Sequence, residues 1–163
     1  MNVSVIIAFV IIATVTLIGA FGAVTARTVF SSGLFLVLSF VGVAGLYVLL
    51  EAPFLAAAQL LIYAGAVAVL ILFAIMLTRR VMSETPGAQT NSQWPLAALV
   101  AAALFGVLAL VTSQDWPISA EAPPADSVAA LGAAFLGPYI LPFEIISVLL
   151  MAALVGAIII ARE

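Results

Sequence analysis

The chain has 163 residues, of which 67% are hydrophobic and only 7% charged, and its mean hydropathy is +1.42. A soluble domain has roughly 45–50% apolar and about 25% charged residues, because its surface has to be largely polar. The composition therefore excludes a soluble enzyme and a disordered tail. The four basic residues are all arginines and the net charge is -3, which excludes a basic surface for nucleic acid. We expect a protein embedded in lipid.

The residue types that hold metals and redox centres are missing from the sequence. There is no cysteine and no histidine, so the chain has no ligands for an iron–sulfur cluster, a haem iron or a zinc site of the usual kind. We predict no catalytic residue, no bound cofactor and no bound metal in this chain. If it belongs to a redox enzyme, it does not carry the electrons itself.

Five segments have the roughly 20 apolar residues that a helix needs to cross the hydrocarbon core. They predict an all-α membrane protein, a single integral membrane domain over residues 1–163, with spans at about 2–24, 29–50, 54–78, 94–113 and 140–161. A polar loop precedes the fourth span, and a longer loop rich in proline and acid precedes the fifth. Within the longer loop, Asp126 and Ser127 predict the start of a short helix through Leu136 at the membrane surface.

Five spans place the two ends of the chain on opposite sides of the membrane. Arginine in short loops marks the cytoplasmic side. With five spans, all the arginines fall on one side of the membrane and most of the acids on the other. The arginines are Arg27, Arg79, Arg80 and Arg162, and the acids are Glu51, Asp115, Glu121 and Asp126. We therefore predict an N-terminus outside and a cytoplasmic C-terminus.

Small residues on the first three spans predict close helix packing, a main source of attraction between helices in lipid. They are Gly19, Gly22, Ser39, Gly42, Gly45, Gly65 and Ala66. With few charges and no polar cavity lining of its own, the chain is expected to pack against other subunits.

Two acids at the ends of spans are candidates for a proton path. Glu51 lies at the outer end of the second span, as a solvated turn residue or as a carboxylate facing a hydrated cavity between subunits. Glu144 follows Pro142 and is expected in the first turn of the fifth helix, where the helix dipole favours an anion. The more ordinary role of Glu144 is to cap the helix, and the more specific role is to carry protons.

The third span carries two polar side chains on one face. Gln59 and Tyr63 are four residues apart, and Gln59 lies roughly 8 Å into the membrane at 1.5 Å per residue. They are suited to hydrogen bonding with neighbouring helices or to ordering water. Gly65 weakens the helix nearby, so residues 63–66 form a plausible flexible point.

Residues 56–77, with the sequence AAAQLLIYAGAVAVLILFAIML, closely resemble subunit J of respiratory complex I, the family of mitochondrial NADH dehydrogenase subunit six. A second stretch, residues 131–158, also resembles this family and contains Leu141-Pro142-Phe143-Glu144. The tyrosine-glycine-alanine core with its aliphatic continuation is the more specific of the two signals.

The resemblance implies a non-redox membrane-arm subunit of the proton-pumping NADH–quinone oxidoreductase, in the cytoplasmic or inner membrane. It implies a π-bulge near Tyr63 and Gly65, whose rearrangement opens or closes a water-filled connection between the quinone cavity and the antiporter-like subunits. Tyr63, Gly65, Val67 and Leu70 would then form the conformational gate. Subunits A, H and K and the antiporter-like subunits are the implied partners. FMN, iron–sulfur clusters, NADH and quinone are implied for the whole complex.

Two other functions fit the same helix architecture. One is a small subunit of a multi-component cation/proton antiporter, and the other is a purely structural membrane scaffold. Gate and scaffold both require small residues and a few hydrogen-bonding side chains, so the sequence does not separate them.

Overall fold

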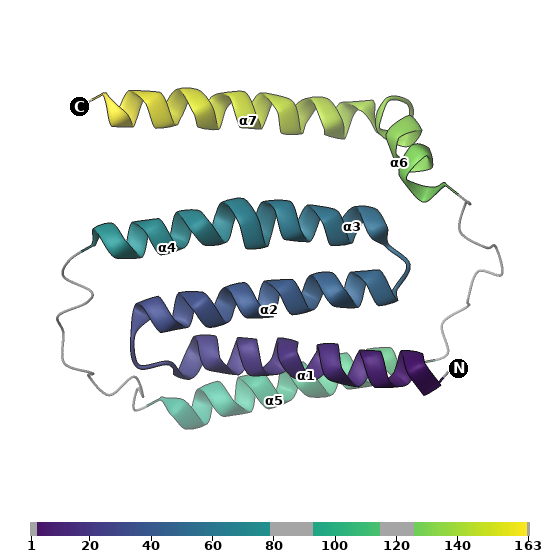
Figure 1. The fold of residues 1–163 in the computed structure, drawn as a ribbon, viewed down its shortest axis with the longest axis vertical. Coiled ribbons are helices and arrows are strands. Elements are labelled where there is room, and N and C mark those ends of the chain that lie inside the picture. Colours follow the sequence, from purple (N-terminus) through teal and green to yellow (C-terminus); the bar gives the residue numbers. More distant parts are fainter. Residues whose placement is uncertain (1–2, 79–92, 115–125, 163) are drawn as a thin grey trace. The chain divides into compact units, whose positions relative to one another are not determined.

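A computed structural model describes residues 3–78, 93–114 and 126–162 (Figure 1). All regular structure in these ranges is helical. Five helices are long and apolar enough to cross a membrane: α1 (Val3–Thr25), α2 (Val29–Leu49), a third span (Pro53–Leu77), α5 (Trp94–Thr112) and α7 (Ile140–Ala161). The predicted all-α fold with five spans is confirmed, and the predicted span limits agree with these to within one residue.

The chain divides into two compact units, Met1–Glu121 and Ala122–Glu163. Four of the loop charges used to predict the orientation lie outside the described residues: Arg79, Arg80, Asp115 and Glu121.

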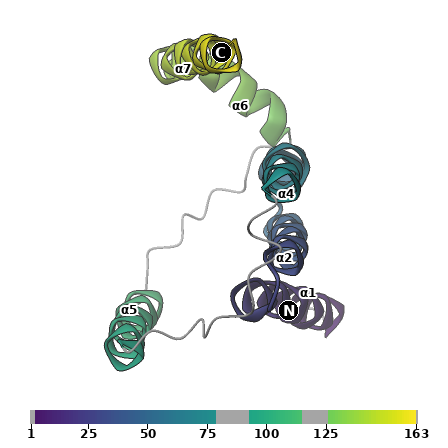
Figure 2. The same cartoon turned by 90° about the vertical axis from the view of Figure 1, so that its left-hand side faces the viewer.

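The first two helices form an antiparallel hairpin with a short turn. Thr28 caps α2, because its hydroxyl oxygen accepts a hydrogen bond from the Ser31 backbone nitrogen at 3.1 Å. The Ser32 hydroxyl donates to the Ala23 carbonyl and ties the two helices together. Figures 1 and 2 show α2 between α1 on one side and the third span on the other.

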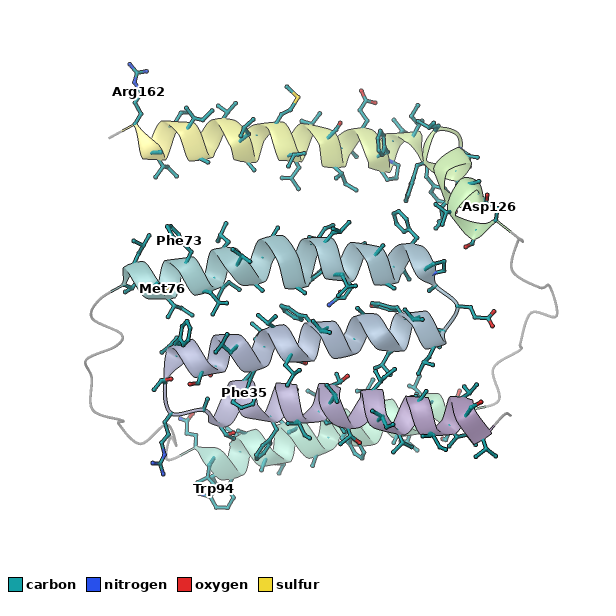
Figure 3. The ribbon with its side chains drawn as sticks, viewed as in Figure 1. Phe35, Phe73, Met76, Trp94, Asp126 and Arg162 are labelled. Atoms are coloured by element: carbon teal, nitrogen blue, oxygen red, sulfur yellow. The ribbon has the colours of Figure 1, made fainter. Side chains whose placement is uncertain are left out.

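Glycines allow α1 and α2 to approach until their backbones touch, as predicted from the small residues. A methyl group added to Gly19 would lie 2.6 Å from the Ser39 backbone nitrogen, and one added to Gly42 would lie 3.0 Å from the Thr16 Cα atom. Gly22 leaves the space that the Phe35 ring occupies between the two helices (Figure 3). Close van der Waals contact of this kind holds helices together where lipid removes the hydrophobic driving force.

The third span is continuous but consists of three parts: α3 (Pro53–Ala58), the π-helix η1 (Gln59–Val67) and α4 (Ala68–Leu77). Pro53 occupies the start of α3, where its missing N–H costs nothing. In η1 the backbone widens, so that the Ala68 N–H donates to the Tyr63 carbonyl five residues back. The predicted π-bulge in the third helix is therefore confirmed.

The second unit contains a short helix, α6 (Ser127–Phe135), followed by α7. Asp126 caps α6, as predicted, because its carboxylate accepts a hydrogen bond from the Ala129 nitrogen at 3.0 Å. Figure 3 shows Asp126 at the start of α6 and Arg162 at the far end of α7. The rings of Phe135 and Phe143 stack with centroids 6.4 Å apart and join the two helices.

The expected place of Glu144 in the first turn of the fifth helix is wrong. Helix α7 begins at Ile140, and its first turn contains no acid. Pro142 is accommodated as the third helical residue, because the first four N–H groups of a helix have no partner within it. Glu144 is therefore the fifth residue, beyond the exposed amides, and the predicted capping role is lost.

Candidate functional site

Tyr63 lies in the middle of η1 and faces α2. Its ring meets the ring of Phe40 edge-on, with centroids 5.6 Å apart and an angle of 71° between the planes. The Tyr63 side chain is nevertheless 48% exposed on the surface of this chain. One edge of the ring is thus fixed against α2 while the rest is available to a neighbour.

Gln59 begins η1 and is one of the few buried polar residues that the structure describes, with 9% of its surface exposed. Small side chains continue this packed side of the third span, because Ala56 and Ala68 are also buried. The structure therefore brings Gln59 and Tyr63 to the side of the span that packs on α2, as their spacing predicted.

Val67 and Leu70 lie on the outer surface of the same span. Val67 is 38% exposed and Leu70 is 70% exposed, whereas Ala68 between them is buried. Phe73 also points away from α2 (Figure 3). The aliphatic part of the predicted gate is thus separated from the polar pair and faces whatever covers the third span.

Gly65 leaves one position of the π-helix without a side chain. A methyl group at this position would lie 3.2 Å from the Leu60 carbonyl oxygen, five residues earlier on the same helix. A larger side chain would press on that turn, so Gly65 is the residue of η1 at which added bulk most directly disturbs the backbone.

Glu51 occupies an unusual backbone position between α2 and α3. Its φ is 55°, and it is the only described non-glycine residue with a positive φ. The Ala52 nitrogen donates to the Tyr47 carbonyl and the Glu51 nitrogen to the Val48 carbonyl, the pattern of a Schellman turn. Glycine normally fills this position because it bears no Cβ. The exposed carboxylate of Glu51 is therefore held in a conformation that its own backbone disfavours.

Glu144 is exposed on α7 in the second unit. The structure brings together Gln59 and Tyr63 of the predicted polar residues, and it places Glu51 in a turn one short helix before them.

Sequence reasoning missed Phe40, which orients Tyr63. Nothing in the sequence of α2 distinguishes Phe40 from the other aromatic residues of that helix, because the contact depends on the register between two helices. The tight turn at residues 50–52 would have been the usable signal, since it fixes that register.

These features define a class of protein: a multi-pass membrane subunit whose third span contains a π-helix beside an exposed tyrosine. The sequence model of the family NADH-ubiquinone/plastoquinone oxidoreductase chain 6 matches residues 19–160. NAD(P)H-quinone oxidoreductase chain 6 of Leptolyngbya boryana is 44% identical over 97% of this chain and 80% of its own length. The Nostoc sp. protein of the same name is 42% identical over 97% and 79%. F(420)H(2) dehydrogenase subunit J of Methanosarcina mazei is 41% identical over 94% and 89%.

The chain therefore belongs to the NADH-ubiquinone/plastoquinone oxidoreductase chain 6 family. It is a membrane subunit of an oxidoreductase complex of the complex I type, and other subunits of that complex are its partners. The predicted resemblance is confirmed, and the names of the relatives favour it over a small subunit of a multi-component cation/proton antiporter.

Proposed function

We propose that the third span is a conformational gate in the membrane arm of a proton-translocating NADH–quinone oxidoreductase. It would control a water and proton connection between the quinone cavity and the antiporter-like subunits. The observation that carries the proposal is the π-helix Gln59–Val67, which coincides with Tyr63 and ends beside the outward-facing Val67 and Leu70. Single π-helical turns inside α-helices frequently occur at functional sites.

Conversion of this segment to an α-helix changes the hydrogen-bond partners along η1, including the one at its end. The Ala68 N–H donates to the Tyr63 carbonyl in the π-helix, and in an α-helix it would donate to Ala64 instead. The change turns one side of the span relative to the other by about 100°, because an α-helix has 3.6 residues per turn. Val67 and Leu70 then enter or leave the passage, and aliphatic constrictions of this kind close a pore by expelling water.

The ring contact that this motion would loosen is a weak one. The edge contact between Tyr63 and Phe40 is the aromatic contact of η1 that the motion would loosen, and such pairs contribute about 0.5–1.5 kcal/mol beyond the area they bury. A minor state a few kcal/mol above the major one is still measurably populated. The quinone reaction, carried out by other subunits, would supply the bias between the two states.

The relatives support a role for this chain away from the electron donor. Their names give NAD(P)H in one case and F(420)H(2) in the other, although both are about equally similar to this chain. Its sequence, without cysteine or histidine, does not fit an iron–sulfur cluster. We therefore assign FMN, iron–sulfur clusters, NADH and quinone to other subunits, and we propose subunits A, H and K and the antiporter-like subunits as neighbours.

The proposal is tested with Gly65→Leu in the intact complex, compared with Gly106→Leu on α5, where an added side chain meets nothing described within 4 Å. We expect Gly65→Leu to retain quinone reduction in membrane vesicles but to lose most of the protons translocated per electron. Gly106→Leu should keep both. Undiminished proton translocation in an assembled Gly65→Leu complex would contradict the gate and leave the scaffold role.

A further inference from the structure

Gln59 has hydrogen-bonding groups that the described residues of this chain do not satisfy. The side chain is about nine-tenths buried, yet its amide makes no hydrogen bond within the described part of the chain. Neither amide atom is fully enclosed, because no fully buried side-chain nitrogen or oxygen there lacks a partner. The stem of Gln59 is therefore packed, while its amide reaches the surface of the chain.

The position of this amide makes lipid an unfavourable neighbour. Gln59 lies six residues after the start of the span at Pro53, about 9 Å along the helix at 1.5 Å per residue. An amide without a hydrogen bond in an apolar medium is costly, and hydrocarbon offers neither donors nor acceptors. The Gln59 amide must therefore meet a polar group from beyond the helices described as packed around it.

The helix packed against η1 does not supply that group. The antiparallel contact between Phe40 and Tyr63 brings Ala44, one turn further along α2, to the level of Gln59. Ala44 is 2% exposed and has no polar side-chain atom. Helix α2 contains no acid, arginine or amide side chain, and none of its serine and tyrosine hydroxyls makes a hydrogen bond with Gln59.

We propose that Gln59 is a docking point for a helix of a neighbouring membrane subunit, through a neutral side chain that donates and accepts hydrogen bonds at once. A primary amide offers both an N–H donor and a C=O acceptor. A lysine or arginine partner would satisfy only the carbonyl, and an ionised carboxylate only the N–H group. A protonated carboxyl, an amide or a hydroxyl satisfies both, and such side chains connect helices in membranes.

The docking point lies where it can hold one end of the π-helix. Gln59 is the first residue of η1, and Val67 is its last. A hydrogen bond at Gln59 would anchor the entrance of the segment to a neighbouring helix, while Val67 and Leu70 beyond it stay free to turn. This inference concerns assembly, so it goes beyond the proposed gate and does not depend on it.

The test uses the intact complex extracted from membranes and exposed to rising concentrations of a denaturing detergent. Gln59→Met keeps the length of the side chain and removes its hydrogen bonds. Leu61→Met, two residues along at a 74% exposed position, is the matched control. We expect about a tenfold rise in the fraction of this chain dissociated for Gln59→Met, as an interhelical hydrogen bond is lost, and no rise for Leu61→Met. The amount of each variant in the membrane is measured separately, so that failed insertion is not counted as dissociation.

Gln59→Glu identifies the chemistry of the partner. A protonated glutamate donates and accepts as the amide does, so a neutral partner predicts dissociation close to that of the unaltered complex. Dissociation lower than that of the unaltered complex would reveal a cationic partner and overturn the proposal of a neutral one. Dissociation greater than that of the Gln59→Met complex would reveal an ionised carboxylate as the partner. That result would also overturn the proposal of a neutral partner.

Dissociation of Gln59→Met equal to that of Leu61→Met would show that the amide meets water or lipid, and would overturn the docking point. The gate is tested by proton translocation in Gly65→Leu, not by assembly. A stable Gln59→Met complex together with an uncoupled Gly65→Leu complex would thus remove the docking point alone.

Discussion

Glu51 shows how a single residue can hold a conformation that a different residue would adopt more easily. Its left-handed backbone completes the Schellman turn that reverses the chain between α2 and α3. The turn sets the register that brings Phe40 to Tyr63. The exposed carboxylate takes no part in the backbone hydrogen bonds that close the turn.

Replacing Glu51 with glycine should stabilise the turn. A left-handed conformation costs a non-glycine residue roughly 1–2 kcal/mol, and part of this gain is lost to the greater freedom of glycine in the unfolded chain. We expect Glu51→Gly to raise the free energy of unfolding in mixed micelles by about 0.5–1 kcal/mol. Glu51→Ala removes the same carboxylate but keeps the strain, so it should give no gain. An equal gain in both variants would show that the Glu51 charge, and not its backbone conformation, destabilises the turn.

At the scale of elements, the contact of α1 with α2 is closer than that between ordinary helices. Backbone atoms of the facing helix occupy the space for a side chain at Gly19, and the side chain and Cα atom of Thr16 occupy it at Gly42. The third span, by contrast, meets α2 through larger side chains, with Leu72 filling the space beside Gly33. This difference leaves α1 and α2 as a fixed pair against which the third span can turn.

Gly19→Leu should force this pair apart. A methyl group alone would come within 2.6 Å of the Ser39 backbone nitrogen, which belongs to a helix backbone and cannot rotate aside. We expect a loss of about 1–3 kcal/mol or more in the free energy of unfolding in mixed micelles, the usual cost of overpacking. Gly156→Leu on α7, where nothing described lies within 4 Å, is the control and should change little. Similar losses in both would show that leucine itself, and not the helix contact, is responsible.

The elements themselves could be predicted from the sequence because each depends on local signals. Long apolar runs set the spans, Asp126 set the start of α6, and the resemblance of residues 56–77 set the place of the π-helix. Features that depend on contacts between elements could not be predicted. The ring contact of Phe40 needs the register of two helices, and Glu51 adopts a conformation that its residue type disfavours. Glu144 lies beyond the first turn of α7, because the helix begins two residues before Pro142 and a proline is tolerated within the unpaired first turn.

At the scale of the whole molecule, the scarcity of charge indicates that this chain contributes helix packing to the complex and not charged groups. Helices α5 and α7 bury none of their residues within the described chain. In a membrane such helices are covered by lipid or by other helices. The chain would thus contribute a packed three-helix layer and a convertible π-helix to a complex in which other subunits carry the charges.

The orientation of this molecule can be tested because the sequence contains no cysteine. We propose an outer N-terminus and a cytoplasmic C-terminus, from the arginines at Arg27 and Arg162. A membrane-impermeant maleimide added to intact cells should label Glu51→Cys, whereas Arg27→Cys and Arg162→Cys should react only after permeabilisation. Labelling of Arg27→Cys in intact cells would reverse the assignment.

The most direct test of the gate is the hydrogen-bond ladder of the third span in the intact complex, seen by structure determination at rest and during turnover. The Ala68 N–H, the donor at the end of η1, is one position of the ladder at which conversion is seen. We predict that this N–H donates to the Tyr63 carbonyl in one state and to the Ala64 carbonyl in the other, with Val67 and Leu70 turned between them. An unchanged bond from Ala68 to Tyr63 in both states of a proton-translocating complex would contradict the account.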